Sequence, residues 1–448
     1  MKLIVLKEAD AAETRVAASP ETVKKLVGLG LSVVVEAAAG AKSNMSDKAY
    51  ADAGATIARN RAVAIKGADI ILGVKAPTAA QLKGAARGAV VIGTLNPYAN
   101  ASLMKSYASA GLTSLAMELM PRITRAQSMD ILSSQSNLAG YKAVLDAANE
   151  YSCALPMMMT AAGTVPAARV FIMGAGVAGL QAISTAKRLG AIVSATDVRA
   201  AAKEQVESLG GSFVMVDADE GDSGETAGGY AKEMSADYKK RQAALVAEHI
   251  AKQDIVITTA LIPGRPAPEL VSTKMVESMK AGSVIVDLAA EQGGNCSLTK
   301  PGKVIQHKGV TIMGHLNNAG RLAGNASALY ARNLFNLIDA FWDKENKTLA
   351  LNWEDEIIKG IALTHEGAVI HPILGDKKPA ARKAAISKTA SSKTVSPKTA
   401  SAKTASAKPA ARKAPTKKAA PAAKAAPKVA AKKPSASRGA TRQTKGTK

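Results

Sequence analysis

The sequence predicts an α/β protein with two doubly wound domains and a cleft between them, followed by a disordered basic C-terminal tail. Three observations support this. Short apolar runs alternate with amphipathic stretches over the first 376 residues, which is the pattern of βαβ units around parallel sheets. The pattern starts a second time at "ARVFIMGAG". After Asp376 the composition collapses to Lys, Ala, Ser, Thr and Pro.

The formal net charge of +23 belongs to that last segment and not to the whole chain. Residues 377–448 contain 21 Lys and Arg and no Asp or Glu, whereas the first 376 residues contain 38 basic and 36 acidic residues, a net charge of +2. Residues 377–448 also lack aromatic side chains, so they have too little apolar surface to offset the entropy of ordering. We therefore predict a disordered tail.

Two further features bound the class of protein. Cys153 and Cys296 are the only cysteines and lack metal-ligand spacing, which argues against a disulfide-built secreted protein and against a cysteine metal site. The most apolar stretch, 151–186, contains Arg169, Pro156 and Pro166, which argues against a membrane helix. We expect a cytoplasmic protein that binds no metal.

The first domain is predicted to span 1–137 and to be completed by 319–376. Ser19 and Pro20 are suited to begin a helix that Gly30 ends, and residues 325–341 form a second helical stretch. Its strands are apolar with little alternation, as expected where both faces of a sheet are covered. The predicted strands lie within 2–8, 31–37, 68–75, 89–95 and 112–119.

The second domain is predicted to span 138–318, and residues 377–448 form the tail. The glycine motif of this domain, "GAGVAG", follows the apolar strand "RVFIM" and precedes a helix that Gly190 closes. This context is typical of Rossmann-like dinucleotide-binding domains. The predicted strands lie within 168–176, 191–197, 254–260, 282–289 and 310–315.

Each glycine of the motif has a physical role in that fold. Gly174 permits a tight turn, Gly176 lets a pyrophosphate approach the backbone, and Gly179 lets the helix pack on the strand. Asp197 ends the next strand, 23 residues after Gly174, where it would accept hydrogen bonds from ribose hydroxyls and repel a 2′-phosphate. This favours NAD(H), although Arg199 complicates the preference unless its side chain points elsewhere.

Three further stretches make a family recognisable: "RITRAQSMDILSSQSNLAGYKAVLDAA", "GETAGGYAKEMS" and "TTALIPGRPAPELV". Together with the glycine motif they resemble the NAD(H)-binding domain of proton-translocating NAD(P) transhydrogenase, the soluble portion of that enzyme's alpha subunit, which belongs to the alanine dehydrogenase/transhydrogenase family. The resemblance covers residues 1–375.

The resemblance implies that Gln127 and Asp130 position the nicotinamide without acting as acid or base, with Arg122 organising Asp130. Read from the residues alone, Asp130 and Ser133 are better explained as caps of a helix. Gly229 and Tyr230 would belong to a mobile loop that closes on the cofactor. In full, the candidate cofactor contacts are Arg122, Gln127, Asp130, Ser133, Gly174, Gly176, Val177, Gly179, Asp197, Val198, Arg199, Gly229, Tyr230, Thr259, Ala260 and Leu261.

The resemblance also implies an activity and partners. The domain would bind NADH and pass hydride to NADP⁺ held on a partner domain, coupled to proton movement through a separate membrane subunit. Because hydride passes directly between two nicotinamide rings, no acid or base is needed. We expect a homodimer that is peripheral on the cytoplasmic face of the inner membrane, with the NADP(H)-binding domain and the membrane subunit on other chains.

Two other functions stay open. Arg15 and Lys75 resemble residues that grip the substrate carboxylate in alanine dehydrogenase, but Asn96 stands where that enzyme carries a histidine acid/base. Oxidative deamination needs such a proton-transfer group, so we interpret Arg15 and Lys75 as structural ion-pair partners. Alternatively, the chain is an NAD-sensing, non-enzymatic protein whose tail binds nucleic acid. Contact with anionic lipid, or no dedicated role, explains the tail better in a membrane-associated subunit.

Overall fold

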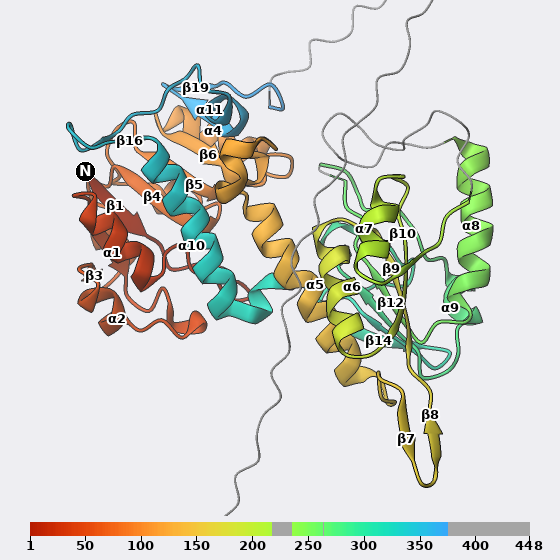
Figure 1. The fold of residues 1–448 in the computed structure, drawn as a ribbon. Coiled ribbons are helices and arrows are strands. Elements are labelled where there is room, and N and C mark those ends of the chain that lie inside the picture. Colours follow the sequence, from red (N-terminus) through yellow and green to blue (C-terminus); the bar gives the residue numbers. More distant parts are fainter. Residues whose placement is uncertain (217–234, 263, 375–448) are drawn as a thin grey trace, which may run out of the picture. The chain divides into compact units, whose positions relative to one another are not determined.

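A computed structural model describes residues 1–216, 235–262 and 264–374 of the chain (Figure 1). The described residues form one eight-stranded and one seven-stranded sheet, both largely parallel and flanked by helices. The α/β, doubly wound fold class predicted from the sequence is confirmed. The predicted disordered tail, 377–448, lies outside the described residues.

The first sheet has the order β3-β2-β1-β4-β5-β6, with all neighbouring pairs parallel. This is the strand order of a Rossmann fold, and the direction of addition reverses between β1 and β4. Beyond β6, β18 and then β19 extend the sheet in antiparallel orientation. These strands are β1 (Lys2–Val5), β2 (Ser32–Glu36), β3 (Thr56–Ala58), β4 (Ile70–Lys75), β5 (Val90–Thr94), β6 (Thr113–Ala116), β18 (Ala362–His365) and β19 (Ala368–Val369).

The central strands of this sheet are buried on both faces, as their apolar composition predicts. In β1, Leu3 and Val5 belong to one hydrophobic cluster, whereas Ile4 belongs to the cluster on the other face. Helix α10 (Ala323–Ala340) contributes Tyr330 and Leu334 to the cluster that holds Leu3. Residues after 319 therefore add two helices, α10 and α11 (Glu356–Ile361), and two strands to the first sheet's layers.

The second sheet repeats the same strand order, β11-β10-β9-β12-β13-β15, with β14 added antiparallel at one edge. Its reversal lies between β9 and β12, which are parallel neighbours. Strand β14 was not predicted, because its side chains are alternately exposed and half-buried and do not form a continuous apolar run. The strands are β9 (Arg169–Met173), β10 (Ile192–Thr196), β11 (Ser212–Phe213), β12 (Ile255–Thr258), β13 (Val284–Asp287), β14 (Val304–His307) and β15 (Val310–Met313).

Helix α5 (Ile131–Glu150) packs against helices that belong to both sheets. It contacts α6 (Val177–Arg188) so closely that a Cβ at Gly140 would overlap the Ala178 carbonyl oxygen. Near its start, Ser134 Oγ donates to Asn333 Oδ1 of α10 at 2.8 Å. The other α-helices are α1 (Pro20–Gly28), α2 (Asp47–Asp52), α3 (Arg61–Ile65), α4 (Ala101–Ser109), α7 (Ala202–Ser208), α8 (Ala236–Ile250), α9 (Thr273–Ser278) and α11 (Glu356–Ile361).

Local signals behave as the sequence predicts at α1. Ser19 Oγ accepts the Thr22 N–H at 3.2 Å, and Gly30 has a φ of +90° after the helix. Two small hairpins were not predicted, β7 (Met158–Thr160) with β8 (Gly163–Val165) and β16 (Trp342–Asp343) with β17 (Thr348–Leu349). The β7–β8 hairpin projects away from the second sheet (Figure 1). Within the described ranges, no helix combines the length and apolar character needed to cross a bilayer.

Candidate functional site

The glycine motif forms the turn between β9 and α6. Gly174 has a φ of +107°, a left-handed conformation that glycine adopts without strain. A Cβ at Gly179 would overlap the Gly174 carbonyl oxygen, so only glycine lets the helix pack this closely on the turn. Around Gly176, in contrast, no atom outside that glycine and its two chain neighbours lies within 4 Å of the position a Cβ would take. The turn is therefore tightly packed at Gly174 and Gly179 and open at Gly176.

The N-terminus of α6 begins at this open position. Gly176 is the N-cap, no side chain caps the helix, and its first turn contains no acidic residue. The backbone N–H groups of a first turn and the positive end of the helix dipole favour an anion. Val177, the first helical residue, is 40% exposed. Because Gly176 leaves room for a close approach, these residues fit the pyrophosphate of a dinucleotide.

Asp197 lies beside the turn, in the loop after β10. Its Oδ2 accepts the Ala175 N–H at 2.8 Å, which ties the loop to the middle of the glycine turn. Arg199 donates from its backbone N and from Nε to Oδ1 at 2.9 Å each, and from Nη2 to Oδ2 at 2.8 Å. Burial raises the pKa of Asp197, but the hydrogen bonds from Arg199 and Ala175 lower it further, so the pKa lies below its ordinary value.

Arg199 thus points toward Asp197, so it does complicate the preference for NAD(H) that Asp197 alone would give. The Asp197 side chain is only 7% exposed, and a charge at that burial needs a partner, which Arg199 supplies across the intervening Val198. Each oxygen of Asp197 already accepts two hydrogen bonds, so ribose hydroxyls would compete with Arg199 for the same acceptor positions. The ion pair also weakens the repulsion that Asp197 alone would exert on a 2′-phosphate.

The stretch 259–261 follows β12, the strand next to β9. Thr259 Oγ1 donates to the Gly174 carbonyl oxygen at 2.9 Å, so this stretch touches the glycine turn directly. Ala260 is held by the side chain of Asn295, and Leu261 is 43% exposed. The carboxyl ends of β9 and β12 flank the reversal of strand order, which is where doubly wound sheets bind ligands.

Two residues next to this stretch, Asn295 and Asp287, were not predicted from the sequence. Asn295 bonds both backbone groups of Ala260, and Asp287 accepts the Asn295 N–H at 2.7 Å. Both side chains are fully buried. The available signal was the segment "EQGGNC", a Gly-Gly-Asn turn shortly after the strand that ends in Asp287.

The polar residues predicted at 122–133 lie in the loop before α5 and in its first turn. Asp130 is the N-cap of α5: its Oδ1 accepts the Ser133 N–H at 3.0 Å and its Oδ2 accepts the Ser133 hydroxyl at 2.5 Å. The capping role that the residues alone indicated is thus present, and it leaves further lone pairs on the carboxylate. Arg122 and Gln127 are exposed, Gln127 within the 3₁₀ helix η4 (Thr124–Met129).

The structure brings together one group of predicted residues by direct contact. Gly174, Asp197 and Thr259 are joined through the hydrogen bonds of the glycine turn. Asp130 and Ser133 are connected to this group through α5, whose Asn137 Nδ2 donates to Gln181 Oε1 of α6 at 3.3 Å. The predicted loop residues Gly229 and Tyr230 lie outside the described residues.

Arg15 and Lys75 form ion pairs, which confirms that interpretation. The Arg15 guanidinium donates to both carboxylate oxygens of Glu13 at 2.8 Å, and Lys75 Nζ lies 2.6 Å from Asp10 Oδ2. The carboxylate of Glu13 thus occupies the fork of Arg15 that would bind a substrate carboxylate.

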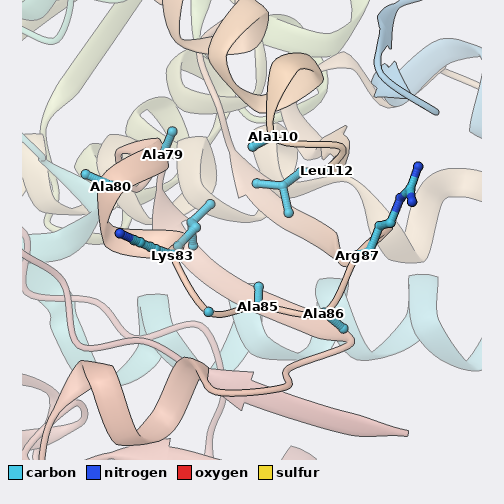
Figure 2. A pocket seen from close by; sticks show the side chains of 10 residues that line it. Ala79, Ala80, Lys83, Ala85, Ala86, Arg87, Ala110 and Leu112 are labelled. Atoms are coloured by element: carbon cyan, nitrogen blue, oxygen red, sulfur yellow. The ribbon is translucent and has the colours of Figure 1, made fainter.

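A separate pocket of about 400 Å³ lies in the first domain (Figure 2). It is lined by Ala79, Ala80, Leu82, Lys83, Gly84, Ala85, Ala86, Arg87, Ala110 and Leu112. These residues precede β5 and β6, at the amino ends of the strands. The pocket is therefore at the opposite edge from the carboxyl ends of the strands and is not part of the candidate site.

The chain is similar in sequence and in structure to known proteins. Residues 4–139 match the family "Alanine dehydrogenase/PNT, N-terminal domain" and residues 143–372 match "Alanine dehydrogenase/PNT, C-terminal domain". The chain is 54% identical over 379 residues to the first portion of a divided NAD(P) transhydrogenase subunit alpha from Rhodospirillum rubrum, covering 84% of this chain and 99% of that one.

Two further similarities concern a longer relative and a solved structure. The chain is 44% identical to NAD(P) transhydrogenase subunit alpha from Cereibacter sphaeroides, with 83% of this chain and 71% of that one covered. The crystal structure of transhydrogenase from Sinorhizobium meliloti is 58% identical and superimposes with a TM-score of 0.75, covering 83% of this chain and all of that one.

Proposed function

The chain belongs to the alanine dehydrogenase/PNT family, as an enzyme of the NAD(P) transhydrogenase alpha-subunit type, and we propose that it is the NAD(H)-binding subunit of a proton-translocating transhydrogenase. In this function it passes hydride from NADH to NADP⁺ held on a partner domain. The observation that carries the proposal is the open position at Gly176, flanked by Asp197 and Thr259 at the strand-order reversal of the second sheet.

The roles of the residues follow from their positions. Gly176 and the first turn of α6, with Val177, hold the pyrophosphate, while Gly174 and Gly179 keep that turn closed. Asp197, with Val198 and Arg199 in its loop, faces the adenosine ribose. On the nicotinamide side we place Thr259, Ala260, Leu261, Arg122, Gln127, Asp130 and Ser133, with Gly229 and Tyr230 closing over them.

A bound NADH supplies the hydride, and the residues of this chain supply orientation. Gln127 offers both a donor and an acceptor to the carboxamide, and the carboxylate of Asp130 offers acceptors beyond those that cap α5. Neither side chain needs to move a proton. Holding the ring in a reactive geometry is a large catalytic contribution when two rings react directly.

We also propose that the NADP(H)-binding domain and the proton-conducting membrane subunit reside on other chains. The share of each relative's length that this chain matches supports the proposal. The Rhodospirillum rubrum relative, named as one portion of subunit alpha, is matched over 99% of its length, whereas the Cereibacter sphaeroides relative, named as subunit alpha, is matched over 71%. With such partners, the chain would be peripheral on the cytoplasmic face of the inner membrane.

A homodimer is the proposed assembly. The β7–β8 hairpin and the residue before it expose Met157 by 62% and Met159 by 80%. Exposed apolar side chains on a projecting element are suited to bury surface against a second copy. The charge-introducing variant Met159→Glu should therefore shift the molar mass measured by light scattering from that of a dimer toward that of a monomer.

The main experiment mixes the full chain with a purified transhydrogenase NADP(H)-binding domain and follows reduction of NADP⁺ by NADH. The proposal expects NADH-dependent reduction that requires both proteins. Alanine-dependent formation of NADH by this chain alone, without activity in the mixture, would instead identify an alanine dehydrogenase.

A gel shift over a range of salt concentrations tests the nucleic-acid alternative. The full chain is compared with one ending at Asp376, whose net charge is only +2. Equally strong DNA binding by both would contradict the proposal, because the first 376 residues would then be the nucleic-acid-binding region.

A further inference from the structure

We propose that Asn295 is a positioning residue that fixes the Ala260 peptide and thereby sets how the 259–261 stretch faces the nicotinamide. The inference rests on the function proposed above. It adds to that function a fully buried side chain that acts through its contact with Ala260 and that neither the motif nor the resemblance includes.

The contact between Asn295 and Ala260 engages both backbone groups of one residue. Asn295 Oδ1 accepts the Ala260 N–H at 3.0 Å, and Nδ2 donates to the Ala260 carbonyl oxygen at 2.9 Å. Its second Nδ2 hydrogen goes to the Pro268 carbonyl oxygen at 2.8 Å. The side chain thus replaces a neighbouring strand at the point where the chain leaves β12, which ends at Thr258.

Asp287 in turn fixes Asn295. The carboxylate is fully buried at the end of β13 and is held by neutral donors. Gly294 allows the loop to come this close, because a Cβ there would lie 2.8 Å from Asp287 Oδ2 and its φ is +89°. The donors to Asp287 are the N–H groups of Ala289 (2.9 Å), Asn295 (2.7 Å) and Cys296 (3.0 Å) and the hydroxyls of Thr258 (3.1 Å) and Thr299 (2.6 Å).

Within 259–261, the hydrogen bonds of Asp287 and Asn295 reach only Ala260, on the proposed nicotinamide side. Other contacts hold the glycine turn, on the proposed pyrophosphate side. The glycine turn is tied by Ala175 to Asp197, and Thr259 reaches the Gly174 carbonyl oxygen with its own hydroxyl. Loss of the Asn295 side chain therefore frees Ala260 while the contacts around Gly176 remain. The consequence is a selective loss of ring orientation, with most of the binding contacts kept.

The test compares Asn295→Ala with wild type in the full chain. The NADH dissociation constant is measured by nucleotide fluorescence, and the single-turnover rate of NADP⁺ reduction is measured with the NADP(H)-binding domain at saturating NADH. We expect the rate to fall about 10- to 100-fold, as a misplaced reacting group can cause. The NADH dissociation constant should change by less than about threefold.

Gln253→Ala is the matched control. Gln253 is a buried amide of the same sheet's layers, 3% exposed, and its Nε2 donates to the His249 carbonyl oxygen at 3.0 Å, before the amino end of β12. This variant should lower thermal stability with little change in rate or affinity. The inference would be overturned if Gln253→Ala lost as much rate as Asn295→Ala. It would also be overturned if Asn295→Ala lost rate and NADH affinity in parallel, or lost neither.

Hydrogen exchange provides a readout that is independent of activity. The Ala260 amide of the wild-type chain should be protected, and Asn295→Ser, a milder variant for use if Asn295→Ala does not fold, should lose that protection. An unprotected Ala260 amide in the wild type would contradict the inference. A wild-type chain that neither binds NADH nor supports transfer would contradict the proposed function itself. An active wild type with an indifferent Asn295→Ala would contradict the positioning role alone.

Discussion

The two sheets share one strand order but treat the point where it reverses differently. In the first sheet the reversal lies between β1 and β4, and the Glu8 side chain lies at this point. Its Oε1 accepts the Val74 N–H at 2.7 Å, and its Oε2 accepts the Lys75 N–H at 3.2 Å. In the second sheet the reversal lies between β9 and β12, and Gly176 leaves it open. In the first sheet, a side chain of the protein thus accepts the N–H groups at the strand end. In the second sheet, the N–H groups of the first turn of α6 remain available to a ligand.

Other carboxylates close the first sheet in the same way. Glu118 accepts the Leu95 N–H at 3.2 Å, and Glu36 accepts the Lys7 N–H at 2.9 Å. Burial raises the pKa of Glu118 despite such hydrogen bonds. These carboxylates accept N–H groups that could otherwise bind an anionic ligand, so this edge suits a nucleotide phosphate less well than the edge at Gly176 does.

In the first domain, the largest expected effect comes from breaking the buried ion pair between Glu13 and Arg15. Its side chain is fully buried and pairs with Arg15, which is 15% exposed. Glu13→Gln leaves the guanidinium without a counter-charge, so we expect the free energy of unfolding to fall by about 3–5 kcal/mol in urea denaturation. The double variant Glu13→Leu/Arg15→Met should lose less. A fall smaller for the single variant than for the double would contradict the role of the pair.

The next effect is the pH dependence that Glu8 imposes on the closed edge. The pKa of Glu8 is raised from 4.5 to about 7, because burial raises it by more than the hydrogen bonds from Val74 and Lys75 lower it. The folded chain then holds a proton that the unfolded chain releases, so stability contributed below pH 4.5 is lost as the pH rises through 7. The loss is on the order of 3 kcal/mol.

Urea denaturation at about pH 5 and about pH 8 tests this for wild type and Glu8→Gln. The variant should be less pH-dependent than wild type, because its side chain cannot ionise. Identical pH dependence in both proteins would show that Glu8 does not titrate in this window.

On the open edge, two glycines of one motif should respond differently. Gly179→Ala forces a methyl group against the Gly174 carbonyl oxygen, so we expect a loss of about 1–3 kcal/mol in the free energy of unfolding. Gly176→Ala meets no atom within 4 Å and should leave the free energy of unfolding nearly unchanged while it weakens NADH binding. Equal destabilisation by the two substitutions would contradict the separation of a closed and an open position.

The smallest effect concerns selectivity at Asp197. Arg199→Met removes the side chain that occupies the carboxylate, so Asp197 becomes free for ribose hydroxyls and for repulsion of a 2′-phosphate. The ratio of the NADPH to the NADH dissociation constant should rise about three- to tenfold, measured by titration calorimetry. An unchanged or lower ratio would contradict the claim that Arg199 masks Asp197 from the ribose and the 2′-phosphate.

Much of the site could be predicted because its signals are local in the sequence. The strand "RVFIM", the glycine spacing and the carboxylate at the end of the next strand depend on neighbours within one βαβ unit. The N-caps at Ser19 and Asp130 likewise use acceptors three residues from their donors. Arg199 and Asp197 are also close in the sequence, but their pairing depends on the side-chain rotamer of Arg199, which the sequence pattern does not specify.

By itself, the sequence determined the α/β class, the parallel strands and the dinucleotide turn, because periodicity and glycine placement act over a few residues. Only the tertiary structure decided that Asn295 holds Ala260, 35 positions earlier in the chain, and that Glu8 closes the first sheet by bonding Val74. Buried polar groups take whichever partners the packed chain brings within hydrogen-bond distance. Those partners become neighbours only once the sheets have formed.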